Sequence, residues 1–143
     1  MEEEQETEKR ERRRNRPWIC LWIQRRSTHG AEVLLRELAL EDPRSYMNVL
    51  RMNADTFNEL LDMIQNRIQK KDTQMRRAIP TRLKLEVTLR FLASGDSLKS
   101  LSYFFRLPPS TISKFLPHIL NAIRIVLAPH LQVRRFSISL LNF

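Results

Sequence analysis

Helical spacing of apolar residues, in a chain with almost no glycine, is the feature that most constrains this fold. The 143 residues include only two glycines, Gly30 and Gly95. Apolar and polar side chains show little of the period-two alternation that marks a half-buried strand. The clearest stripe instead follows one face of a helix: Phe57, Leu60, Leu61, Ile64 and Ile68. We therefore predict an all-α fold.

Residues that favour helix ends divide the chain into helical segments. Asp42 followed by Pro43 is typical of a helix start, because proline needs no amide partner in the first turn. Gly95 stands where a left-handed residue is expected to end a helix. Further candidate caps, in chain order, are Ser27 or Thr28 (for a helix through Glu37), Asn53 or Asp55, Thr81, Asp96 or Ser97, and Ser110.

The helix expected after Thr81 has two distinguishable faces. Leu85, Leu89 and Leu92 share one face, which we expect to line the core. The other face carries Arg82, Glu86 and Arg90 at i, i+4 spacing, with Glu86 well oriented to pair with Arg90.

The two ends of the chain differ in composition from its middle. Residues 1–16 hold a block of acids and then a block of bases, which predicts a disordered charged tail. Residues 17–127 are the predicted helical domain, in which the tryptophans Trp18 and Trp22 belong to an arm that docks on the core. We expect a surface loop at residues 70–80 and a divergent C-terminal tail at residues 128–143, with strand-like alternation at 136–140.

Positive charge is concentrated toward the C-terminus. The chain has 25 Lys and Arg against 16 Asp and Glu, a net charge of +9. Asp96 is the last carboxylate side chain, and the residues from Ser97 onward carry bases but no acids. Such a segment attracts polyanions, and nucleic acid is the natural partner because counterion release drives binding. A solvated basic face without a partner is the alternative. The block at residues 9–16 is either part of a disordered tail or a nuclear-import signal.

Several other function classes lack their required residues. A single cysteine, Cys20, excludes a disulfide framework and a cysteine zinc cluster, and between tryptophans we expect it to be buried. His29, His118 and His130 lack metal-ligand spacing. Neither a glycine-rich phosphate loop nor a nucleophile elbow is present. No apolar run approaches a membrane span, and the N-terminus does not resemble a secretion signal.

The expected lengths of the segments within residues 81–127 match those of a helix-turn-helix. The expected pieces are a helix over Ser97–Phe105, a turn over Arg106–Pro109, and a second helix from Ser110. The turn holds two prolines in place of the usual glycine. A plain three-helix packing unit remains the alternative, because periodicity alone does not separate the two.

The second of these helices has an apolar face and a polar face. Ile112, Phe115 or Leu116, and Ile119 are expected to pack inward. Hydroxyls, amides and a lysine near a helix N-terminus suit phosphate and guanine contacts. We predict that the groove is approached by Ser110, Thr111, Ser113 and Lys114, and the DNA backbone by Lys99 and Arg106. Pro117 removes an amide, which predicts a stop or kink after residue 116 and a separate segment over His118–Leu127.

Three stretches together resemble the N-terminal region of PIF/Harbinger transposases and of the nucleases derived from them. The stretches are LRMNADTFNELL at residues 50–61, LRFLASGDS at residues 89–97, and SLSYFFR at residues 100–106 followed by STIS at residues 110–113. They have the family's order and spacing, and the resemblance extends over about two-thirds of the chain, residues 30–125.

The resemblance implies a fold, a partner and a location. In that family a helix-turn-helix precedes an RNase H-like catalytic domain, whose three carboxylates hold two metal ions for strand cutting. The family is also associated with a Myb-like protein that helps nuclear import and DNA recruitment. The resemblance thus implies a nuclear location, shared with the cytoplasm. Because Asp96 is the last carboxylate here, no downstream triad exists, and we expect a truncated DNA-binding module that is not itself an enzyme. We expect no cofactor and no small-molecule substrate, since the divalent metal belongs to the full-length family.

Two alternative functions stay open. The helical core could serve as an adapter for a Myb-like protein or a full-length relative, for which the apolar residues 17–23 are suited. Alternatively, the chain is part of a metal-dependent nuclease that is active only when another chain supplies the carboxylates.

Overall fold

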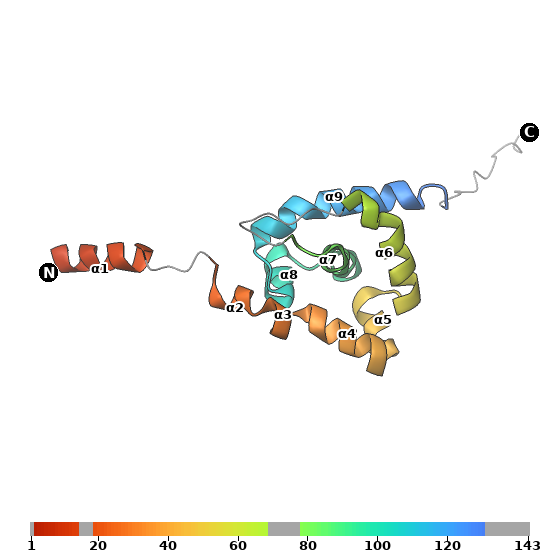
Figure 1. Cartoon of the computed structure of the whole chain (residues 1–143), viewed down its shortest axis with the longest axis horizontal. Helices are drawn as coiled ribbons and strands as arrows, with labels where there is room; N and C mark the ends of the chain where they lie inside the picture. The colour runs from red at the N-terminus through yellow and green to blue at the C-terminus, as the bar shows by residue number, and fades with distance from the viewer. Residues whose placement is uncertain (1, 15–18, 69–77, 131–143) are drawn as a thin grey trace, which may run out of the picture.

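The computed structural model describes residues 2–14, 19–68 and 78–130, which form helices joined by turns (Figure 1). The helices are α1 (Glu2–Arg14), α2 (Leu21–Gln24), α3 (Arg26–His29), α4 (Ala31–Glu41), α5 (Pro43–Leu50), α6 (Ala54–Ile68), α7 (Thr81–Ser94), α8 (Leu98–Phe105) and α9 (Pro109–Leu127). These residues contain no strand, so the predicted all-α class is confirmed.

Helix α7 lies at the centre of the molecule. In Figure 1 it is seen end-on, with α8, α9, α6, α5 and α4 around it. Every residue from Leu83 to Leu89 is buried, because α7 packs against α5, α6, α8 and α9 on different sides. Leu85 and Leu89 are buried as predicted, but the face that carries Glu86 is buried too, and Arg90 pairs with Asp96 rather than with Glu86. Glu86 lies inside rather than on a surface face, and Leu92, expected in the core, is 57% exposed.

The burial of the Glu86 carboxyl is partly compensated by an ion pair with a residue of the same helix. Arg82, one turn earlier, places Nε 3.2 Å from Glu86 Oε1. The other oxygen, Oε2, has no hydrogen-bond partner among the described residues. Burial outweighs the attraction of Arg82 and raises the pKa of Glu86 to about 8. The same environment raises the pKa of the neighbouring core phenol of Tyr46 to about 12.

Four predicted helix ends are confirmed by hydrogen bonds or backbone angles. The amide of Ser45 donates to Asp42 Oδ1 over 3.1 Å, with Pro43 in the first turn. Two further caps are Asn53, which accepts from the amide of Thr56 over 2.8 Å, and Ser97, which accepts from the amide of Ser100 over 3.1 Å. Gly95 ends α7 with φ +68°, a left-handed conformation that favours glycine.

Three other predicted helix starts are wrong. Pro80 and Pro108, rather than Thr81 and Ser110, are the N-cap residues of α7 and α9. The fixed φ of proline suits this boundary, and proline has no amide to leave unpaired. The single helix expected from Ser27 or Thr28 is divided at Gly30, which is extended and precedes α4. A Cβ on Gly30 would lie 2.6 Å from the carbonyl oxygen of Arg26, which explains the glycine there.

The N-terminal segment is helical where we predicted disorder. Residues Glu2–Arg14 form α1, which lies apart from the other helices in Figure 1. Acids occupy its first turns and bases its last turns, so both blocks complement the helix dipole. Glu6 and Arg10 are also spaced i, i+4, which favours a helix. Trp18, most of the predicted loop at 70–80 and the alternation at 136–140 lie outside the described residues.

Helix α9 is continuous through Pro117, which contradicts the predicted break after residue 116. The ring of Pro117 is exposed, so it displaces no core residue. Buried side chains lie on both sides of it, with Phe115 and Leu116 before and Ile119 and Ala122 after. Packing of this stripe stabilises one helix against the loss of a single amide hydrogen bond.

Candidate nucleic-acid interface

The turn Arg106–Pro108 connects α8 to α9 and is held by packing on both sides. Leu107, within the turn, is fully buried, and its amide donates to the carbonyl of Ser102 over 3.2 Å. Leu101 and Phe105 of α8 and Ile112 of α9 belong to the same buried cluster. The core therefore fixes the orientation of α9 relative to α8 and α7.

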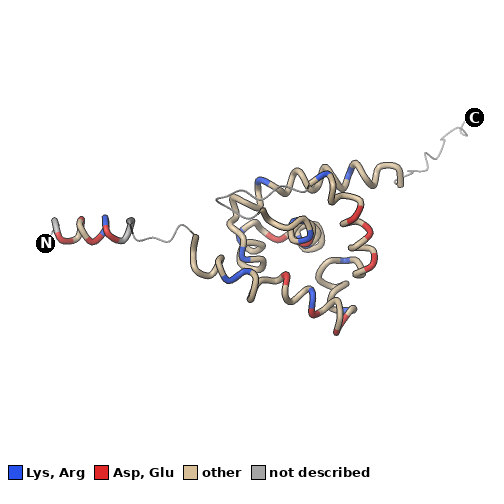
Figure 2. The backbone as a smooth tube through the Cα atoms, in the orientation of Figure 1, with Lys and Arg blue, Asp and Glu red and all other residues tan. Residues whose placement is uncertain are grey.

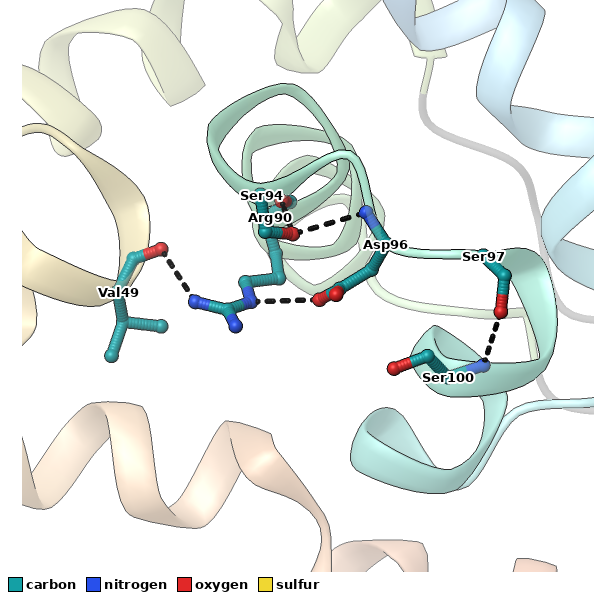
Figure 3. Close-up of polar contacts among 6 residues, drawn as sticks. All are labelled: Val49, Arg90, Ser94, Asp96, Ser97 and Ser100. Atoms are coloured by element: carbon teal, nitrogen blue, oxygen red, sulfur yellow. Dashed lines mark hydrogen bonds and ion pairs between the residues drawn. The ribbon is translucent and has the colours of Figure 1, made fainter.

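The connection between α7 and α8 is also rigid (Figure 3). Arg90 Nε lies 3.1 Å from Asp96 Oδ2, and Arg90 Nη1 is 3.5 Å from the carbonyl oxygen of Val49 on α5. One guanidinium thus ties α5, the end of α7 and the start of α8 together. Ser97 then caps α8. These contacts hold residues 89–97 in place and so set the direction of α8.

The exposed side of the first turns of α9 carries most of the predicted contact residues. Ser110, Ser113 and Lys114 are exposed and Thr111 is half-buried. The hydroxyl of Ser113 donates to the carbonyl of Ser110 over 3.0 Å, which holds it close to the helix surface. Lys99 is exposed on the neighbouring helix α8. The structure therefore brings four of the six residues together on α9 and leaves Lys99 on α8.

Few backbone amides at the start of α9 are available to an anion. Pro109 has no N–H, and the amides of Thr111 and Ile112 both donate to the carbonyl of Pro108, over 2.9 and 3.2 Å. Within the first turn this leaves the Ser110 amide for an anion. Side chains rather than a ring of amides are therefore the main groups that this end of α9 offers to a phosphate.

The sixth predicted residue, Arg106, is directed toward the N-terminal arm α2–α3. Its Nη1 donates to the carbonyl of Trp22 over 2.9 Å, and its Nε donates to the carbonyl of His29 over 3.1 Å. The ring of Trp22 also lies 5.9 Å from the ring of Tyr103 on α8. Trp22 therefore docks on the exposed Tyr103 of α8 and does not join the core cluster as we expected. Sequence reasoning missed the anchoring contacts of Arg106, because they join residues more than seventy positions apart.

Charge is divided between two sides of the molecule. Figure 2 shows basic but no acidic residues along α9, whereas acids recur along α6. The acids of α6 are Asp55, Glu59 and Asp62, all exposed. Arg124 adds an exposed cation near the end of α9, where its Nη2 donates to Asn121 Oδ1 over 3.0 Å. The prediction did not single out Arg124, although its place in the acid-free segment was visible.

The described residues offer little to other kinds of chemistry. No group of three or more His, Cys, Asp or Glu side chains is arranged to hold a metal ion there. Cys20, the N-cap residue of α2, is exposed rather than buried as expected. Within the ranges that the structure covers, no helix is both long and apolar enough to cross a membrane.

Comparisons with protein-family models, curated proteins and solved structures found nothing that matches this chain. The resemblance to Harbinger transposases therefore stays a prediction from the three sequence stretches.

Proposed function

We propose that this chain is a DNA-binding module in which α8, the turn and α9 act as a helix-turn-helix. The observation that carries the proposal is the exposed polar surface of α9, formed by Ser110, Ser113 and Lys114 on a helix whose opposite face is buried. A helix anchored on one side and polar on the other suits entry into the major groove. Lys99 on α8 then lies toward the flanking phosphates.

The charge distribution supports the same proposal. From α8 to the end of α9 there is no carboxylate side chain to repel phosphates. Binding would come mainly from phosphate contacts and would fall steeply as salt rises. Thr111 completes the groove-facing set, and Arg106 positions the N-terminal arm beside α8 in place of contacting DNA directly.

The proposal extends to the predicted ancestry and location. We infer a Harbinger-derived module that acts in the nucleus, with double-stranded DNA as its main partner and no nuclease activity of its own. Incubation with supercoiled plasmid and Mg²⁺ tests the last point, and we expect no nicking. Nicking that survives purification and is abolished by chelation would favour the nuclease alternative.

Fluorescence anisotropy with a labelled DNA duplex tests the binding itself. Lys114→Ala and Lys99→Ala should each weaken binding, and each should reduce the salt dependence by about one phosphate contact. Arg44→Ala, which removes an exposed charge on α5, is the matched control and should change neither. If Arg44→Ala weakens binding as much as Lys114→Ala, the attraction is general and α9 is not the interface.

An adapter function is the second candidate, and one observation favours it. Leu40, at the end of α4, is 85% exposed, and Leu34 of α4 and Met47 of α5 are also exposed. Large apolar side chains exposed on neighbouring helices suit a protein partner, such as a Myb-like protein or a full-length relative. Leu40→Lys should abolish capture of that partner while DNA affinity stays unchanged. Capture that survives the substitution would place the partner elsewhere.

A further inference from the structure

A threonine on the N-terminal arm α2–α3 follows two consecutive arginines. Arg25 and Arg26 precede Thr28 by three and two positions. Protein kinases that select basic substrates hold these two positions in an acidic groove, so they recognise a pair of guanidinium groups at this spacing. Among the serines and threonines that the structure describes, Thr28 alone has arginines at both positions.

The hydroxyl of Thr28 lies on the surface of α3. Ser27, Thr28 and His29 are all exposed, and α3 contains no buried residue. Thr28 Oγ1 is 3.2 Å from the carbonyl oxygen of Arg25 and 2.6 Å from Nδ1 of His29, and both of these residues are exposed on the same arm. An enzyme can therefore approach the hydroxyl from solvent without displacing a core side chain.

The arm is also suited to local opening, which a kinase requires because it binds its substrate as an extended segment. Helices α2 and α3 have four residues each, contain no buried residue and lie at the edge of the helical domain (Figure 1). Arg106 fastens them to the end of α8 through the carbonyls of Trp22 and His29. Short surface helices of this kind open more easily than the core, so the arm can present Thr28 while the rest of the molecule stays folded.

We propose that Thr28 is phosphorylated by an arginine-directed serine/threonine kinase. The γ-phosphoryl group of Mg-ATP is transferred to Thr28 Oγ1. The bond between Oγ1 and phosphorus forms, the bond between the γ-phosphorus and the β–γ bridging oxygen breaks, and ADP leaves. The hydroxyl proton passes to the catalytic base of the kinase. This modification does not depend on DNA binding.

Site-resolved mass spectrometry tests the proposal on the full chain. The chain is incubated with Mg-ATP and the catalytic subunit of cyclic-AMP-dependent protein kinase, which selects arginines at these two positions, and the phosphate is located by peptide fragmentation. We expect phosphate on Thr28. Arg25→Gln should lower the initial rate at Thr28 by about ten-fold, because one of the two recognised guanidinium groups is lost. Arg44→Gln, which removes an exposed charge on α5, is the matched control and should leave the rate unchanged.

A second variant tests the contribution of the arm. Arg106→Gln removes both hydrogen bonds to the arm, so α3 should open more often and the rate at Thr28 should rise several-fold. Reading each site separately keeps Ser137, which also follows two arginines but lies outside the described residues, from affecting the result. A chain without phosphate on Thr28 would overturn the proposal, as would phosphate on Ser27 in its place. A rate that Arg25→Gln leaves unchanged would overturn it too, because the arginines would then not be recognised.

Discussion

Helices α7 and α9 are both long and both pack into the core, but they differ in what surrounds them. α7 is enclosed, and even its charged residues Lys84 and Glu86 are buried. α9 has one buried stripe and one exposed polar side. The enclosed helix organises the molecule, whereas the edge helix is free to contact something outside it. We therefore expect substitutions in α7 to act through stability, and we propose that substitutions on the outer side of α9 act through binding.

The largest contrast is expected between Leu85→Ala and Lys114→Ala. Leu85 is fully buried at the centre of α7, so its truncation should lower the free energy of unfolding by about 2–5 kcal/mol. Lys114 is exposed, and its loss should change stability by less than about 0.5 kcal/mol. Urea denaturation followed by circular dichroism measures both. Equal losses would mean that α9 is not a free surface.

The buried carboxyl of Glu86 should make stability depend on pH. Burial raises its pKa to about 8 in the folded chain, so the folded chain retains a proton that the unfolded chain releases near pH 4.5. Stability should therefore fall as pH rises from about 4.5 to about 8 and then level off. By linkage, a pKa raised from 4.5 to about 8 corresponds to a loss of about 5 kcal/mol over this range.

Glu86→Gln is the control for this pH dependence, since the amide does not ionise. Its free energy of unfolding, measured by urea titration across the same pH range, should stay nearly constant. A wild-type chain whose stability rises with pH over this range would contradict the assignment.

Pro117 offers a test on α9. Because the helix is continuous and the proline ring is exposed, Pro117→Ala restores an amide without disturbing the core. Stability should rise by about 1–2 kcal/mol, less than the full cost of proline in a helix interior. Thermal unfolding measures the change. A decrease in melting temperature would mean that α9 depends on a bend at this position.

The smallest effect on stability is expected at Gly95, which ends α7. A Cβ added to Gly95 meets no atom within 4 Å, so Gly95→Ala introduces only the strain of a positive φ. Stability should fall by about 1 kcal/mol, and Gly95→Asn should cost less because asparagine tolerates this conformation better. Chemical denaturation distinguishes the two variants. Identical losses would point to a packing defect in place of backbone strain.

Local patterns predicted the helices with one buried face. Apart from the half-buried Leu61, the stripe of α6 is buried as expected, as are the inward residues of α9. Asp42, Asn53 and Ser97 cap as expected. These features depend on neighbours within one or two turns. The central place of α7 depends on α5, α6, α8 and α9 together, which periodicity within one segment does not reveal.

The candidate interface was predictable in the same limited way. Exposure of Ser110, Ser113 and Lys114 follows from the stripe on the opposite face of α9. The contacts of Arg106 with Trp22 and His29 do not follow from this stripe. To predict them, one must know that the arm α2–α3 folds back onto the end of α8.

An NMR titration of the ¹⁵N-labelled chain with a DNA duplex tests the central claim most directly. We expect the amide resonances of Ser110, Thr111, Ser113 and Lys114 to shift progressively, with smaller shifts at Lys99. Amides on the acidic side of α6, such as those of Glu59 and Asp62, should stay unchanged. Shifts confined to α6, or spread evenly over all helices, would contradict the assignment of α9 as the DNA-binding surface.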